Sequence, residues 1–192
     1  MTNYLTNTNK KIKKTGKLNN KRLFEFNLTA KKTCPQAKDC LKYCFADKGT
    51  YKYPVVKNKY DNNIKATKRE SFSSEIQAEI DKKSIEAIRI HSSGDFYSQK
   101  YLNKWIKIAK KNPKIIFYGY TKSIKYMQSV MCPSNFVFVM STGGKQDHLI
   151  KSTDKKAVIF KTIKELTAAG YTDCSDNDLA ITSTNKIGLI FH

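Results

Sequence analysis

Three cysteines stand close together near the start of the chain, and their spacing suits metal binding. Cys34, Cys40 and Cys44 fall within eleven residues, in the order C-x5-C-x3-C. We expect a loop here, because a loop can bend until three thiolates point at one centre. Three cysteine ligands with an exchangeable fourth position suit a 4Fe-4S cluster, whereas a fourth protein ligand would suit zinc or a closed cluster. The alternative is three ordinary buried thiols.

Two further cysteines stand alone, which brings the total to five. An odd number in a protein of a reducing compartment favours thiols or metal ligands over disulfides. Cys174 lies between Gly170 and the last expected strand, where it is either a fourth ligand of the same centre or a free thiol. Cys132, next to Pro133, is expected to be structural.

Polar residues follow several apolar runs, at positions where strands would end. Ser93, Gly94 and Asp95 form a turn that would expose backbone groups and a carboxylate to a ligand. The alternative is an ordinary turn in which Asp95 or Ser98 caps the next helix. Ser141, at the end of a later run, is a candidate for bonding a ribose.

Four residues at these ends make a predicted substrate pocket. Arg89 and His91 are two positions apart, so they would share one face of a strand. An inward arginine is hard to explain as packing alone, because burying it without an anion is costly. His91 is either catalytic or a hydrogen-bonded core residue. Tyr120 and Lys122, at the end of the third run, complete the pocket.

The layout of these motifs resembles that of radical S-adenosylmethionine enzymes. In that family three cysteines after the first strand hold the cluster, and a Gly-Gly-Glu-Pro turn after the second bonds the methionine amino group. Here the aromatic Tyr43 precedes Cys44, and Asp95 stands in the corresponding turn. The sequence departs from the family in its cysteine spacing, which is C-x3-C-x2-C there, and in having no proline after the acid.

The departures fit a narrower resemblance, to the phage gene product eighty-eight family of radical S-adenosylmethionine-like proteins. It covers about residues 23–192 and is carried by Cys34-Pro35, Cys40, Tyr43 to Ala46, Tyr53-Pro54, Arg89 to His91, Ser93 to Phe96 and Tyr120 to Lys122. The resemblance implies a 4Fe-4S cluster on the three cysteines and S-adenosylmethionine as cofactor. The cofactor-binding residues that it implies are Tyr43, Ser93, Gly94, Asp95 and Ser141. It names no substrate.

Apolar runs alternate with amphipathic stretches over residues 23–192. Runs of strand length are residues 23–28, 85–91, 114–120, 135–141, 157–160 and 187–191. Helical periodicity covers 72–80, 101–109, 124–131 and 163–169, and 175–178 resembles a capping box. This alternation predicts an α/β fold with mostly parallel strands. About 170 residues suit a partial (β/α)6 barrel, radical-SAM-like, or a doubly wound sheet, with the site at the carboxyl ends of the strands.

The chain of 192 residues has a formal net charge of +20. Seven positive charges lie in the acid-free residues 1–22, which we expect to be a flexible basic arm in front of a single domain over 23–192. Residues 48–69 add a net six charges and contain three tyrosines. Both segments are expected to attract nucleic acid or another anionic macromolecule. A solvated basic loop and compositional bias toward lysine are the alternatives.

Two hypotheses about function follow. The first is a radical enzyme that takes electrons from a donor protein and cleaves S-adenosylmethionine. The second is a nucleic-acid-binding phage protein, stabilised by an iron-sulfur cluster or zinc and without catalysis. No run approaches the length of a membrane span, and residues 1–22 lack the pattern of a signal peptide. We therefore expect no membrane partner and a cytoplasmic location, in the host cell if the protein is phage-encoded.

Overall fold

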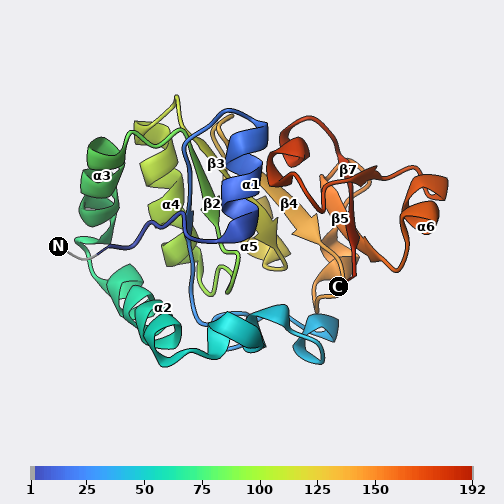
Figure 1. The fold of residues 1–192 in the computed structure, drawn as a ribbon, viewed down its shortest axis with the longest axis horizontal. Helices are drawn as coiled ribbons and strands as arrows, with labels where there is room; N and C mark the ends of the chain where they lie inside the picture. Colours follow the sequence, from blue (N-terminus) through green and yellow to red (C-terminus); the bar gives the residue numbers. More distant parts are fainter. Residues whose placement is uncertain (1–2, 192) are drawn as a thin grey trace.

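Seven strands form one parallel sheet in the computed structural model, which describes residues 3–191 (Figure 1). Residues 1, 2 and 192 lie outside the described residues. The strand order is β1-β2-β3-β4-β5-β7-β6, so β1 and β6 are the outer strands and the sheet is open. Thr6 forms an antiparallel bridge with Glu25 on the outer edge of β1. The strands are β1 (Leu23–Phe26), β2 (Ala87–Ile90), β3 (Ile116–Thr121), β4 (Phe136–Ser141), β5 (Lys156–Phe160), β6 (Thr172–Asp173) and β7 (Lys186–Ile190).

The α/β prediction with parallel strands is confirmed, and each of the six expected runs overlaps a strand. The strand that was not expected is β6, whose two residues are too few to show an alternating pattern. The sheet does not close, and the assignment to a radical-SAM-like barrel stays a prediction.

One face of the sheet, called here the α4 face, is covered by helices that follow the strands. These are α3 (Phe72–Lys83), α4 (Gln99–Lys111), α5 (Ile124–Gln128) and α6 (Ile163–Ala168), with α2 (Pro54–Lys68) packed beside α3. Aromatic rings fill the space beneath them, and the Phe26 ring centroid lies 5.6 Å from that of Phe72 and 5.2 Å from that of Trp105. Burial of these apolar side chains is the main source of stability for such a layer.

The other face, called here the α1 face, is covered by helix α1 (Lys10–Leu18) and the 3-10 helix η5 (Asp178–Thr182). Figure 1 shows α1 lying across the strands. Ile12 and Ile181 pack here against strand residues such as Tyr118 and Val139. Because side chains alternate along a strand, β1 and β2 present Glu25 and Arg89 to this same face.

The described part of residues 1–22 is folded, contrary to the flexible arm expected there. Asn9 caps α1 by accepting the Lys11 N–H at 2.9 Å, and Tyr4 and Ile12 are buried. Gly16 lies so close to the chain that a Cβ there would be 2.8 Å from the carbonyl oxygen of Lys21. The sequence did not predict this helix, because only one narrow side of it is buried and lysines make up most of the rest.

The basic segment 48–69 is also structured. A 3-10 turn, η3 (Gly49–Lys52), leads into α2, with Pro54 at the first helical turn, where a missing N–H costs nothing. None of the helices within residues 3–191 combines the length and apolar character that crossing a bilayer requires.

Candidate functional site

The loop between β1 and α2 carries the three clustered cysteines and crosses the carboxyl edge of the sheet. The Asp39 N–H donates to the carbonyl oxygen of Gly143, just beyond β4, at 3.0 Å. Farther along, the ring of Tyr43 packs edge-on against that of Phe191, just beyond β7, with centroids 5.2 Å apart. Figure 1 shows this loop running below the sheet toward the C-terminus. We call residues 27–53 the cysteine loop.

All three thiols of the cysteine loop are free and partly exposed. Burial, with a smaller contribution from the negative charge of Asp95, raises the pKa of Cys34 to about 12. Charge on Cys44 and on Cys40 also raises the pKa of Cys34, so the three sulfurs are electrostatic neighbours. Three thiols are the donor set that an iron-sulfur cluster or zinc prefers, and metal binding would displace their protons.

The thiols do not yet point at one centre. Among residues 3–191, no group of three or more His, Cys, Asp or Glu side chains is arranged so that it could hold a metal ion. Cys40 lies in the 3-10 turn η1 (Asp39–Leu41), and Cys44 precedes the 3-10 turn η2 (Phe45–Asp47). Gathering the sulfurs around a metal therefore requires the cysteine side chains, or the turns that carry them, to move.

The turn after β2 packs directly beneath the start of the cysteine loop. Ser93 Oγ donates to the carbonyl oxygen of Leu28 at 2.8 Å. Gly94 has φ +90°, and a Cβ there would lie 2.7 Å from both Leu28 Cβ and Thr33 Oγ1. A side chain at Gly94 is thus excluded by backbone conformation and by the neighbouring loop.

Asp95 is buried, and both oxygens of its carboxylate accept hydrogen bonds. Oδ1 accepts the Thr121 hydroxyl at 2.6 Å and the Phe96 N–H at 2.7 Å, and Oδ2 accepts the Lys122 N–H at 2.8 Å. Burial raises the pKa of Asp95 to about 6, although these three hydrogen bonds act to lower it. The cap of α4 is Ser98, not Asp95. Contact of this turn with a cofactor amino group stays a prediction.

Arg89 and Tyr120 come together on the α1 face, as the predicted pocket requires. The guanidinium carbon of Arg89 lies 5.6 Å from the centre of the Tyr120 ring. Arg89 Nη1 also donates to Asp178 Oδ2, which reaches it from η5. This ion pair compensates the charge of the inward arginine.

His91 does not share a face with Arg89, contrary to the prediction. Its backbone has φ +69°, which ends the strand alternation and turns the ring toward the α4 face. There Nε2 hydrogen-bonds to Tyr101 Oη at 2.8 Å, and the ring packs 4.8 Å from that of Phe96. Burial, with a smaller contribution from the charge of Arg89, lowers the pKa of His91 to about 3. The structure therefore has His91 as a neutral core residue.

Lys122 and Ser141 meet at the ends of β3 and β4. Lys122 Nζ donates to Ser141 Oγ at 2.8 Å and also to the carbonyl oxygen of Thr142. The Ser141 hydroxyl proposed for a ribose thus already accepts a hydrogen bond within the chain. Lys122 points to the end of β4 rather than to Arg89.

Three acidic or phenolic residues of the α1 face were missed by sequence reasoning. Asp178 belongs to a segment interpreted only as a capping box, although its carboxylate also pairs with Lys11 Nζ at 2.8 Å. Glu25 is the polar residue between two phenylalanines of β1, and its Oε2 accepts the hydroxyl of Ser92. Tyr118 stands two positions before Tyr120, a spacing that signals a shared face.

The two isolated cysteines lie apart from the loop. Cys174 is completely buried in the α1-face core, and burial raises its pKa to about 11. This agrees with the free-thiol alternative. Cys132 packs against the core of the α4 face, as a structural residue would.

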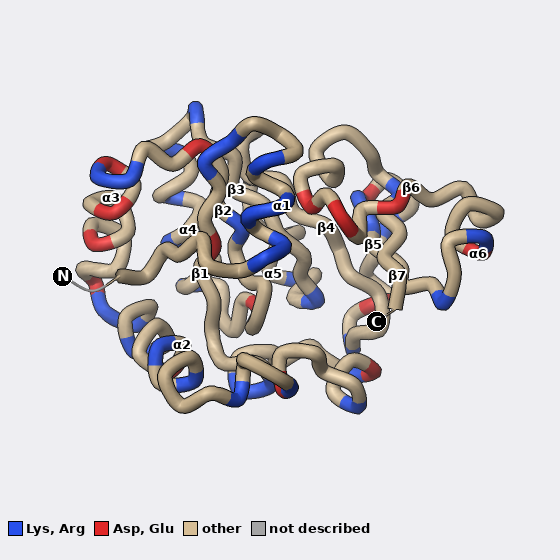
Figure 2. The backbone as a smooth tube through the Cα atoms, viewed as in Figure 1, with Lys and Arg blue, Asp and Glu red and all other residues tan. Residues whose placement is uncertain are grey.

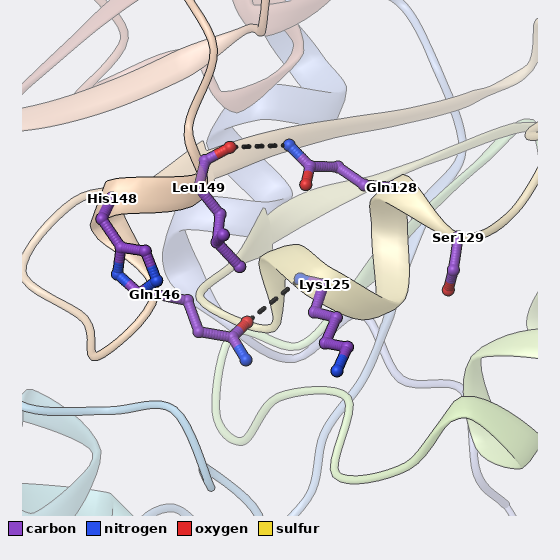
Figure 3. Close-up of a pocket in the computed structure, with 6 residues that line it drawn as sticks. All are labelled: Lys125, Gln128, Ser129, Gln146, His148 and Leu149. Atoms are coloured by element: carbon purple, nitrogen blue, oxygen red, sulfur yellow. Dashed lines mark hydrogen bonds between the residues drawn. The ribbon is translucent and has the colours of Figure 1, made fainter.

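A separate open pocket of about 510 Å³ lies between α5 and the segment after β4 (Figure 3). Gln146 Oε1 accepts the Lys125 N–H at 3.0 Å across it, and Gln128 Nε2 donates to the Leu149 carbonyl at 2.8 Å. No predicted site residue lines this pocket.

Comparison with known proteins places the chain in a family. A search of curated proteins and a search of solved structures give no match. A protein-family model described as Gene product 88 matches residues 3–190, which include α1, the cysteine loop and every strand. The chain therefore belongs to the Gene product 88 family.

Proposed function

We propose that this protein is an iron-sulfur protein of the radical S-adenosylmethionine type, with a 4Fe-4S cluster on Cys34, Cys40 and Cys44. The observation that carries the proposal is the position of three free, partly exposed thiols in one loop over the carboxyl edge of a parallel sheet. Open parallel α/β proteins bind their ligands at that edge. When bound, such a cluster would supply single electrons to S-adenosylmethionine and so start radical chemistry.

The chain's own residues would support this site in distinct ways. Gly94 lets the cysteine loop lie directly on the turn after β2, next to Cys34. Burial raises the pKa of Tyr51 to about 12, and the charges of Glu25, Arg89 and Cys44 also act on it. Tyr51 is therefore an electrostatic neighbour of both the cysteine loop and the α1 face. The substrate side would then be the α1 face around Arg89. A protein electron donor is the implied partner.

Anaerobic reconstitution with iron and sulfide tests the proposal. The reconstituted chain, reduced with dithionite and given S-adenosylmethionine, should release 5′-deoxyadenosine. The radical-enzyme proposal would be contradicted if the purified protein contains zinc and takes up no iron under these conditions. A protein that takes up iron but yields no 5′-deoxyadenosine would leave an iron-sulfur protein without this chemistry.

A second candidate function is a metal-stabilised nucleic-acid-binding protein. The observation that favours it is exposed aromatic side chains among lysines: Phe45 is 61% exposed and Tyr53 60% exposed. Figure 2 shows Lys and Arg positions along α1 and α2. Aromatic rings that stack on bases, with cations that contact phosphates, are the features of single-strand binding.

Salt dependence tests the second candidate. Binding of a single-stranded RNA should weaken steeply as salt rises, and should be lost when Lys52, Lys57, Lys59 and Lys65 are changed to glutamine. A matched control changes four exposed lysines near the end of α4: Lys107, Lys110, Lys111 and Lys114. Equal losses in both variants would mean that net charge alone, rather than this surface, attracts the RNA.

A further inference from the structure

Three buried hydrogen-bond donors on the α1 face have no partner within the described chain. They are Arg89 Nε, Tyr118 Oη and Tyr120 Oη. A buried donor without a partner destabilises the folded state, and native proteins keep few of them. Three together therefore indicate a group that the protein binds.

The three donors lie close to one another. Arg89 on β2 and Tyr118 on β3 are register partners, and Tyr120 is the next residue of β3 on the same face. The Arg89 guanidinium carbon is 5.6 Å from the Tyr120 ring centre. Burial raises the pKa of both phenols, and the positive charge of Arg89 partly opposes this rise. The three side chains are therefore neighbours on one face of the sheet.

The acidic groups nearby are already engaged. Asp178 accepts a hydrogen bond from Arg89 Nη1 and pairs with Lys11. Glu25 accepts hydrogen bonds from Ser92 Oγ and from Asn9 Nδ2. The charges of these two acids balance those of Lys11 and Arg89. Within the described chain, Asp178 Oδ1 accepts no hydrogen bond but lies 2.8 Å from Lys11 Nζ, so the buried groups here without any polar partner are the three donors, one of them on a cation. Such a set fits hydrogen-bond acceptors that carry negative charge.

We propose that Arg89 Nε, Tyr118 Oη and Tyr120 Oη bind an oxyanion, a carboxylate or phosphate group of a small ligand. The ligand would enter beside Tyr120, which is partly exposed near the carboxyl edge of the sheet. The net charge of +20 raises the local concentration of anions around this face. The anion site itself does not depend on the proposed function; only the identification of its ligand as the substrate does.

Titration calorimetry of the full-length chain with inorganic phosphate and, separately, with malonate tests the site. Ionic strength is held constant with sodium chloride, because any anion screens a chain of charge +20. We expect saturable binding of at least one probe, and the arm that binds more tightly identifies phosphate or carboxylate as the preferred group. Tyr118→Phe and Tyr120→Phe should each weaken that binding about tenfold.

Tyr126→Phe is the control, since this tyrosine packs against the core of the α4 face. Arg89→Lys removes the guanidinium that donates to Asp178, and the buried carboxylate left without this donor can prevent folding. Tyr118→Phe and Tyr120→Phe therefore decide whether the anion site exists. Binding no stronger than that of chloride, or equal binding by the Phe variants, overturns the proposal. A loss of stability in anion-free Tyr118→Phe also counts against it, because the hydroxyl would then bond to water. None of these readouts needs iron. A chain that binds no iron-sulfur cluster would therefore not contradict the anion site, and a chain that binds no anion would not contradict the cluster.

Discussion

The Asp95 carboxylate accepts the backbone N–H of Lys122 at 2.8 Å and so ties the turn after β2 to the end of β3. The same carboxylate holds Thr121, and the neighbouring Gly94 supports Thr33 at the base of the cysteine loop. The turn that resembles a cofactor-binding motif therefore also holds the end of β3 and the base of the cysteine loop in place. Changes in it will alter both the fold and the cysteine loop above it.

Asp95→Asn should change how stability depends on pH. The pKa of Asp95 is about 6 in the folded chain, above the unfolded value of about 3.9. Between these values the folded state binds more protons, so stability falls as pH rises through this window. Across this window the titration of Asp95 lowers the free energy of unfolding by about 3 kcal/mol in total. The Asp95→Asn variant should not show this decrease.

Urea unfolding from pH 4 to pH 7 measures this difference. Stability of the wild type should fall relative to that of Asp95→Asn as pH rises. Asp81→Asn, at an exposed carboxylate, is the control. If the curves of the wild type and Asp95→Asn run parallel across the window, Asp95 does not titrate as described.

His91→Asn should change the pH dependence in the opposite direction. The pKa of His91 is about 3 in the folded chain, below the unfolded value of about 6.5, because burial disfavours the charged ring. The unfolded state then binds more protons between these values, so the wild type loses stability as pH falls from about 6.5 toward 3. Asparagine tolerates the φ of +69° at this position.

The same urea series checks this prediction. His91→Asn loses ring packing at every pH, but its stability should fall less on acidification than that of the wild type. His148→Asn is the control, since His148 is exposed. An unchanged loss on acidification in His91→Asn would show that the buried ring is not what makes the fold acid-sensitive.

Gly94→Ala should destabilise the fold by about 3 kcal/mol or more, because the new methyl group meets Leu28 and Thr33 at 2.7 Å in a strained backbone conformation. Gly49→Ala is the matched control, with a positive φ of +52° but nothing within 4 Å of the added methyl group. It should cost about 1 kcal/mol. Chemical denaturation measures both, and the reactivity of Cys34 toward a thiol reagent should rise only in Gly94→Ala. Equal costs would contradict the close packing of loop and turn.

The sequence was sufficient to predict every described strand except β6, because each of the others overlaps an apolar run bounded by turn residues, as in residues 135–141 around β4. It was also sufficient to place Arg89 and Tyr120 at the ends of consecutive strands, where they meet on one face. Alternation of side chains predicts a shared face only within one strand. The alternation stops where a strand ends. His91 shows this, since one left-handed residue sends its ring to the other face.

Other features depend on contacts distant in sequence. Helix α1 buries few side chains, so its lysines dominate the pattern, and Asp178 meets Arg89 from a segment 89 positions away. The arrangement of Cys34, Cys40 and Cys44 is another such feature. Their spacing predicts one loop but does not dictate where each thiol points, because 3-10 turns leave several orientations open.

The most direct test of the metal site is the iron and sulfide content of anaerobically reconstituted protein, with the electron paramagnetic resonance spectrum of the reduced sample. We predict about four iron and four sulfide per chain in the wild type and in Cys132→Ser and Cys174→Ser. Cys34→Ser, Cys40→Ser and Cys44→Ser should each lose most of the iron and the cluster signal. Full iron content in all three variants, or none in the wild type, would contradict a cluster on the cysteine loop.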